Sequence, residues 1–154
     1  MSFHITGLPA DPFADLFSLS DAALAARGAV RRSADRAPGF PCRISLTDAE
    51  VGEEVILTHY EHHPVDSPFR SSYAIYVREG ERTFDAVDEV PMMLRSRLLS
   101  LRAFDMQGML LDADVVEGGE VERLIERLFA DAGVAYIHIH FAKPGCYAAL
   151  VERA

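Results

Sequence analysis

The stretch Val134-Ala135-Tyr136-Ile137-His138-Ile139-His140-Phe141 alternates strictly between two kinds of side chain. Successive side chains of a β-strand point to opposite faces, so this alternation predicts a strand with two different sides. The apolar side would face a core, whereas the other side is aromatic and basic. The members of the two sides are Ile137, Ile139 and Phe141, and Tyr136, His138 and His140.

The segments on either side of this strand have equally clear patterns. Residues 120–132 carry apolar side chains at helical spacing and are followed by Gly133, which predicts the longest helix of the chain. Residues 98–104 and 109–116 predict a hairpin that turns at 105–108. We expect a register that sets Arg102 opposite Asp112 and Ser100 opposite Asp114, because it separates polar from apolar side chains. Pro144-Gly145 turns the chain into a last strand, 146–152.

The N-terminal half is also rich in short strands, with helices only near its start. Strands are predicted at 3–8, 29–33, 42–46, 55–62 and 73–77, and short helices follow Asp11-Pro12 and Ser20. The predicted fold class is α+β: a largely antiparallel, curved sheet of about six to eight strands. We expect the helix at 120–132 and the N-terminal helices to cover one face of it. Residues 1–154 would form a single domain.

Composition excludes several classes of function. The formal net charge is -9 and the sequence pI is about 5.0, so a nucleic-acid partner is not expected. No segment has the run of about 18 apolar residues that a membrane span needs. Two cysteines far apart in the sequence do not predict a disulfide framework, and the N-terminus lacks the features of a signal peptide. We therefore expect a reduced, cytoplasmic protein.

The candidate site lies between Gly39 and Tyr73, a stretch that contains a thiol, two arginines and three histidines. Cys42 precedes Arg43, and a guanidinium near a thiol favours the nucleophilic thiolate. A histidine such as His59 or His138 would complete a catalytic arrangement with Cys42. Alternatively, Cys42 is a small buried core residue, since free cysteines are often buried. For Cys146 we expect a core position.

Arg43 and Arg70 are the candidate ligand-binding residues, together with His140. An arginine inside a strand is costly unless its fork meets a carboxylate or an anionic ligand. Arg70 lies on a loop held by two prolines, and such loops concentrate binding residues. The alternative is an ion pair of either arginine with one of the acidic residues, which include Glu50, Glu61 and Asp66.

His138 and His140 point the same way along their strand and could present two nitrogens to zinc or iron. A third ligand would have to come from 59–63, and only if that strand lies alongside. The alternative is that both histidines occupy the half-wet face of an amphipathic strand. A further reading is a homodimer through the uncovered sheet face, on which tyrosines are available. These are Tyr73, Tyr76, Tyr136 and Tyr147.

Several strings resemble a bacterial family known as a domain of unknown function, numbered twelve hundred and three. The resemblance covers nearly the whole chain and includes FHITGLP at 3–9, GFPCRISL at 39–46, SPFR at 67–70 and GCYAA at 145–149. It implies no reaction, cofactor or partner. The residues alone favour the binding of a small anionic ligand at a Cys/Arg/His cluster, with or without catalysis. An interaction or dimerisation module and a metal-binding protein are the alternatives.

Overall fold

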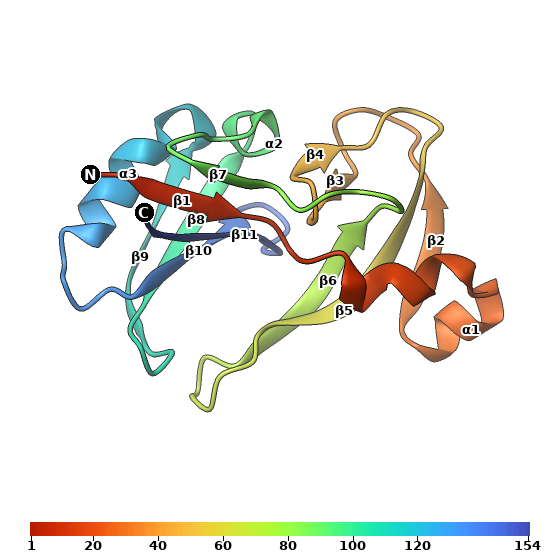
Figure 1. Ribbon diagram of the computed structural model, residues 1–154, viewed down its shortest axis with the longest axis horizontal. Coiled ribbons are helices and arrows are strands. Elements are labelled where there is room, and N and C mark those ends of the chain that lie inside the picture. Colours follow the sequence, from red (N-terminus) through yellow and green to blue (C-terminus); the bar gives the residue numbers. More distant parts are fainter.

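The computed structural model describes residues 1–154, which form two β-sheets that lie side by side (Figure 1). In the six-stranded sheet every neighbouring pair is antiparallel. Its strands, in spatial order, are β7 (Asp85–Val87), β1 (Phe3–Thr6), β11 (Tyr147–Arg153), β10 (Tyr136–Phe141), β8 (Leu98–Phe104) and β9 (Leu110–Glu117).

The five-stranded sheet is mixed, because β3 pairs with β6 in parallel. Its strands, in spatial order, are β2 (Ala29–Ser33), β5 (Glu54–His63), β6 (Ser71–Val77), β3 (Pro41–Cys42) and β4 (Thr47–Asp48). The α+β class and the mostly antiparallel pairing were predicted and are confirmed. The prediction of one sheet is wrong, because strand periodicity shows which face is apolar but not which apolar faces meet.

Each sheet has its own helices and its own core (Figure 1). The helix α3 (Val121–Phe129) continues the short 3-10 helix η2 (Gly118–Glu120) and packs its apolar side on the six-stranded sheet. The 3-10 helix η1 (Asp11–Ser18) and α1 (Asp21–Ala26) instead pack on the five-stranded sheet. The remaining helix, α2 (Met92–Arg95), precedes β8. The prediction that the helices cover one face of a single sheet is therefore wrong. None of them has the length and apolarity that crossing a bilayer requires.

The hairpin of β8 and β9 forms where it was predicted, but its register differs. A bulge at Ala103/Phe104 sets Arg102 opposite Ala113 and Leu101 opposite Asp114. The predicted pairing of Arg102 with Asp112 is therefore absent. Arg127 of α3 instead binds Asp112 at 3.2 Å and Asp114 at 2.9 Å. Asp112 and Asp114 therefore lie on the Leu101 side of the hairpin, which was expected to be apolar. Arg127 from the covering helix neutralises them there.

The predicted strand 42–46 ends after Cys42. The Leu46 N–H donates to the Cys42 carbonyl at 3.1 Å, and Leu46 has a φ of +53°, so residues 43–46 form a turn. The Arg43 N–H still donates to the Tyr76 carbonyl at 3.0 Å. This turn lies between the two sheets, and it allows the Arg43 side chain to reach β11 of the other sheet.

Candidate functional site

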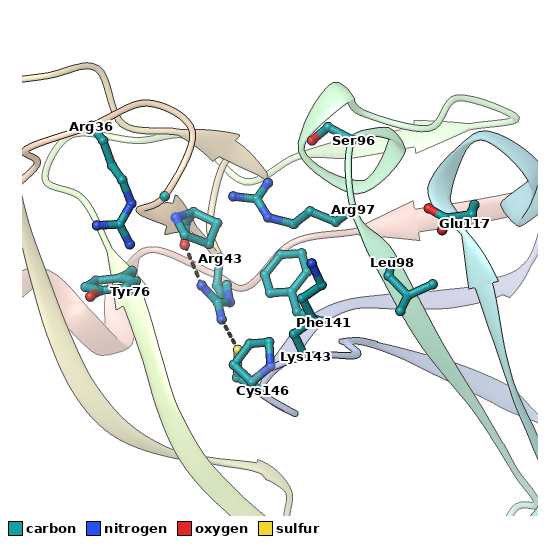
Figure 2. A pocket seen from close by; sticks show the side chains of 13 residues that line it. Arg36, Arg43, Tyr76, Ser96, Arg97, Leu98, Glu117, Phe141, Lys143 and Cys146 are labelled. Atoms are coloured by element: carbon teal, nitrogen blue, oxygen red, sulfur yellow. Dashed lines mark hydrogen bonds between the residues drawn. The ribbon is translucent and has the colours of Figure 1, made fainter.

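Arg43 is a buried cation without a carboxylate partner. Its side chain is 1% exposed, and its guanidinium donates to the Tyr147 carbonyl at 2.7 Å and the Pro41 carbonyl at 2.6 Å. A third N–H donates to Cys146 Sγ at 2.9 Å (Figure 2). The guanidinium carbon also lies 4.8 Å from the centre of the Phe141 ring. These contacts satisfy hydrogen bonds, but none of them supplies a full negative charge.

The electrostatic position of Arg43 follows from this burial. Loss of solvent is the main cause that lowers the pKa of Arg43, and the nearby Arg97 guanidinium lowers it further. The two thiols, Cys146 and Cys42, act in the opposite direction. An arginine side chain remains protonated in proteins even so. A positive charge is therefore held between the sheets without a carboxylate in contact with it.

A cavity of about 550 Å³ opens beside Arg43, and both sheets contribute to its walls (Figure 2). Its charged lining is strongly basic, with four cationic side chains against one carboxylate. The cations are Arg36, Arg43, Arg97 and Lys143, and the carboxylate is Glu117. Cys146 also lines it. A basic cavity in a chain of net charge -9 is a local reversal of the charge of the protein.

The cations of the cavity differ in how far they are neutralised. Arg97 makes a two-pronged pair with Asp48 at 2.6 and 2.9 Å and lies over the Phe141 ring at 4.9 Å. Arg36 is largely exposed and has Asp35 at 3.5 Å. Lys143 forms no ion pair, and Arg43 has no acidic partner. The unneutralised charges of the cavity are therefore the cations Arg43 and Lys143 and the carboxylate of Glu117, which leaves a positive excess.

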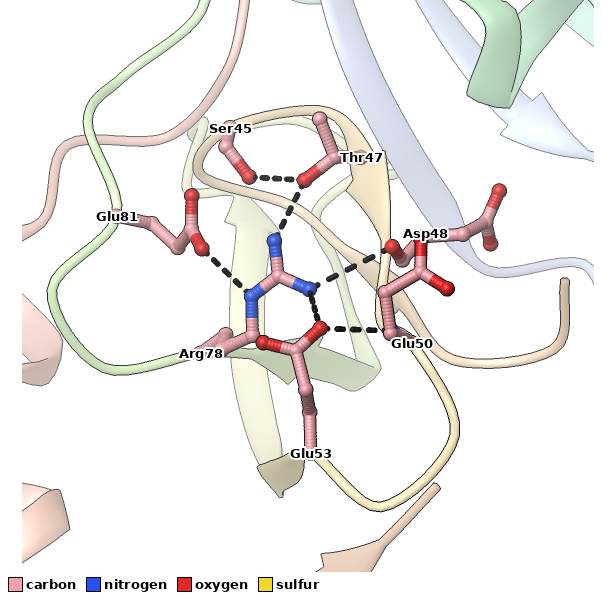
Figure 3. A network of polar contacts seen from close by, with 7 residues as sticks. All are labelled: Ser45, Thr47, Asp48, Glu50, Glu53, Arg78 and Glu81. Atoms are coloured by element: carbon pink, nitrogen blue, oxygen red, sulfur yellow. Dashed lines mark hydrogen bonds and ion pairs between the residues drawn. The ribbon is translucent and has the colours of Figure 1, made fainter. Parts of the chain in front are cut away.

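The pair between Asp48 and Arg97 rests on a second network, centred on Arg78 (Figure 3). Arg78 donates to Glu81 at 2.6 Å, to Glu53 at 3.0 Å and to Thr47 Oγ1 at 2.8 Å. Hydrogen bonds to these carboxylates raise the pKa of Arg78 against the effect of burial. The network fixes the loop around β4 and with it the position of Asp48.

Both cysteines are core residues, as predicted for Cys146, but only Cys146 also contacts the Arg43 guanidinium and lines the cavity. Cys42 is 0% exposed and belongs to the core of the five-stranded sheet, which agrees with the alternative prediction for this residue. Cys146 is the thiol that contacts the guanidinium and lines the cavity. Sequence reasoning missed it because Arg43 and Cys146 are 103 positions apart. The only local signal is a lysine, Lys143, next to the Pro144-Gly145 turn that precedes Cys146.

Arg70 does not join Arg43. It lies on the surface, and its Nε donates to Glu61 at 2.9 Å, which is the alternative that we had considered. The hydrogen bond to Glu61 raises the pKa of Arg70. His59 is exposed as well and contacts Ser72 Oγ at 3.1 Å. The expected convergence of Arg43, Arg70 and histidines on one cavity therefore does not occur.

Four histidines instead gather away from the cavity lining, where the end of β5 lies beside β10. The cluster consists of His62, His63, His138 and His140. His138 and His140 are 5% and 2% exposed, so neither lies on a half-wet face. Strand 54–63 does lie alongside them, as a third metal ligand would require. As the side chains stand, however, no three His, Cys, Asp or Glu residues are arranged to hold a metal ion.

Burial makes these imidazoles resistant to protonation. Loss of solvent lowers the pKa of His138 to about 2, of His140 to about 3 and of His62 to about 4. Neighbouring histidines and the Arg102 guanidinium make smaller contributions to the same shifts. The Nδ1 atoms of His62 and His138 are buried without any hydrogen-bond partner. Leaving a buried polar atom unpaired costs about 1–3 kcal/mol, so these two atoms need an explanation.

The fold and the site together define an α+β protein with a basic cavity between two sheets. The chain belongs to a family described as "Protein of unknown function (DUF1203)", whose model matches residues 39–153. The predicted family resemblance is thus confirmed over these residues, whereas the string at 3–9 lies outside them. The matched part includes every charged residue of the cavity except Arg36. No curated protein and no solved structure matches the chain.

Proposed function

We propose that this protein binds a small molecule carrying a carboxylate or phosphate group in the cavity between its two sheets. The observation that carries the proposal is the pair of unneutralised cations, Arg43 and Lys143, on the wall of one cavity. Arg43 is buried, and an uncompensated buried charge is costly. An anionic ligand held by Arg43 and the exposed Lys143 would compensate it.

The dimensions and the free donors of the cavity support a small ligand. Its volume of about 550 Å³ lies within the roughly 300–1,000 Å³ that small-molecule sites usually have. A guanidinium has five N–H groups, and three protein acceptors take bonds from Arg43. The remaining N–H groups of Arg43 and the ammonium of Lys143 are donors for the anion. Cys146 Sγ, on the same wall, is the one thiol of the lining.

Alkylation of Cys146 tests the charge of the cavity, because iodoacetate and iodoacetamide are similar in size and differ in charge. We expect iodoacetate to react with Cys146 faster than iodoacetamide, the reverse of an isolated thiol, whose thiolate repels the anionic reagent. One unit charge at about 4 Å contributes ~1 kcal/mol in water, or about fivefold in rate. The Lys143→Gln variant should therefore lose about fivefold more in the iodoacetate rate than in the iodoacetamide rate, since any change in the thiolate fraction affects both reagents equally.

The controls come from the same chain. Arg32→Gln removes an exposed cation that is not part of the cavity and should leave both rates unchanged. Cys146→Ser should abolish fast labelling, because Cys42 is 0% exposed. Peptide mapping by mass spectrometry assigns each label. Faster reaction with iodoacetamide in the wild-type protein, or an unchanged rate ratio in Lys143→Gln, would refute an anion-binding cavity.

A further inference from the structure

The histidine cluster contains one imidazole whose role is already explained. His63 Nδ1–H donates to the Phe69 carbonyl at 2.9 Å, since a carbonyl can only accept. Its Nε2 atom then accepts from the Tyr136 hydroxyl at 2.6 Å. Both nitrogens of His63 are thus used within the protein, and we assign this residue a structural role.

The other three imidazoles each present a nitrogen with no protein partner. The Nδ1 atoms of His62 and His138 are buried and unpaired. His140 Nδ1–H donates to the Gly145 carbonyl at 3.0 Å, which leaves the Nε2 atom as an unprotonated lone pair. A metal-bound histidine usually donates its other N–H in this way, and that bond fixes the orientation of the ring.

The distances between the rings of His62, His138 and His140 can be compared with those of a zinc site. Zinc–nitrogen bonds of 2.0–2.1 Å place the centroids of two tetrahedrally arranged imidazoles about 5 Å apart. The His62 and His140 centroids are 5.1 Å apart, so these two rings already have that spacing. His138 is 6.3 Å from His62 and 6.4 Å from His140. The His138 ring is therefore roughly an ångström farther away than that spacing, and the three side chains do not form a metal site as they stand.

We propose that His62, His138 and His140 bind a divalent transition-metal ion, with zinc the first candidate, and that His138 moves toward the other two rings when the ion binds. All three imidazoles are neutral at pH 7, the form that coordinates metals. Three neutral nitrogens would leave a fourth position open on the ion, as in catalytic zinc sites. The inference does not depend on the anion-binding cavity, although the Gly145 carbonyl that orients His140 directly precedes Cys146.

The test uses untagged protein stripped with a chelator and titrated with Co²⁺ and then Zn²⁺. We expect saturation at one equivalent, visible absorption bands of tetrahedral Co²⁺, and their loss when Zn²⁺ displaces it. His138→Gln should weaken Zn²⁺ binding at least tenfold, the usual effect of disturbing a site of this kind. His59→Gln, which removes an exposed histidine, should not alter it.

A second measurement needs no variant and so does not depend on whether the substituted proteins fold. In two-bond proton–nitrogen spectra of the wild-type imidazoles, Zn²⁺ should shift the nitrogens of His62, His138 and His140. The signals of His63, His59 and His4 should stay in place. Absence of saturable binding at millimolar Zn²⁺, or shifts confined to His59 and His4, would overturn the proposal.

Discussion

Replacement of Arg43 by methionine is expected to lower the free energy of unfolding by about 3 kcal/mol. Methionine fills a similar volume but leaves the Tyr147 and Pro41 carbonyls without their donors. Each buried acceptor left unpaired costs about 1–3 kcal/mol. Removal of a buried, uncompensated cation offsets part of this loss. The loss prevails because two carbonyls from different sheets depend on the same side chain.

Urea unfolding monitored by circular dichroism measures this effect. Arg43→Lys keeps the charge but replaces a planar fork by a single ammonium, so it should recover less than half of the loss. Arg32→Met is the matched control at an exposed position and should stay within about 0.5 kcal/mol of the wild type. Wild-type stability in Arg43→Met would show that Arg43 does not hold the two sheets together.

Acidification from pH 7.5 to pH 5.0 is expected to lower the free energy of unfolding by about 4 kcal/mol through His138 and His140, and further through the half-buried His62. His138 and His140 have an unfolded pKa of 6.5, which burial lowers to about 2 and about 3 in the folded protein. Below pH 6.5 the unfolded chain therefore binds protons at these histidines that the folded chain does not bind. Stability is complete above pH 6.5 and falls as the pH approaches the folded values, with each histidine contributing about 2 kcal/mol at pH 5.0.

The charged and titratable groups that face these two imidazoles act in the same direction, since all are bases that add repulsion on protonation. His62 and Arg102 act on both, His63 acts on His138, and Arg43 acts on His140. Hydrogen bonds lower the pKa of Asp88 and Glu122, so both contribute to acid sensitivity mainly below their ordinary values of 3.8 and 4.5. Urea unfolding at a series of pH values between 5.0 and 7.5 isolates the histidines. The slope of stability against pH in His138→Gln should correspond to one proton fewer, whereas His59→Gln should retain the wild-type slope. An unchanged slope in His138→Gln would contradict this account.

Local patterns predicted the elements of this fold but not their assembly. The alternation at 134–141 and the helical spacing at 121–129 identified β10 and α3, because one face of each had to be apolar. The division into two sheets depends on which apolar faces meet, and no local pattern records it. The register of β8 with β9 depends on a one-residue bulge and on Arg127, a residue from another element.

The sequence could predict only those site residues whose burial is costly in free energy without a partner. Arg43 attracted attention because a buried arginine needs partners, and the structure places it on the cavity wall. Arg70 followed the same reasoning and proved to be a surface ion pair with Glu61. The thiol that contacts the guanidinium is Cys146 and not the neighbouring Cys42, because adjacent residues point in different directions while a distant turn supplies the contact.

An NMR titration of nitrogen-15-labelled arginine side chains, followed at their Nε–H signals, tests the anion-binding cavity most directly. Inorganic phosphate and succinate, added at constant ionic strength, should shift the Arg43 and Arg36 signals in a saturable way with one shared dissociation constant. The signal of Arg31, whose Nε–H is held by Glu54 at 2.9 Å outside the cavity, should stay constant. Small shifts of all arginines that never saturate would show that the cavity does not bind an anion.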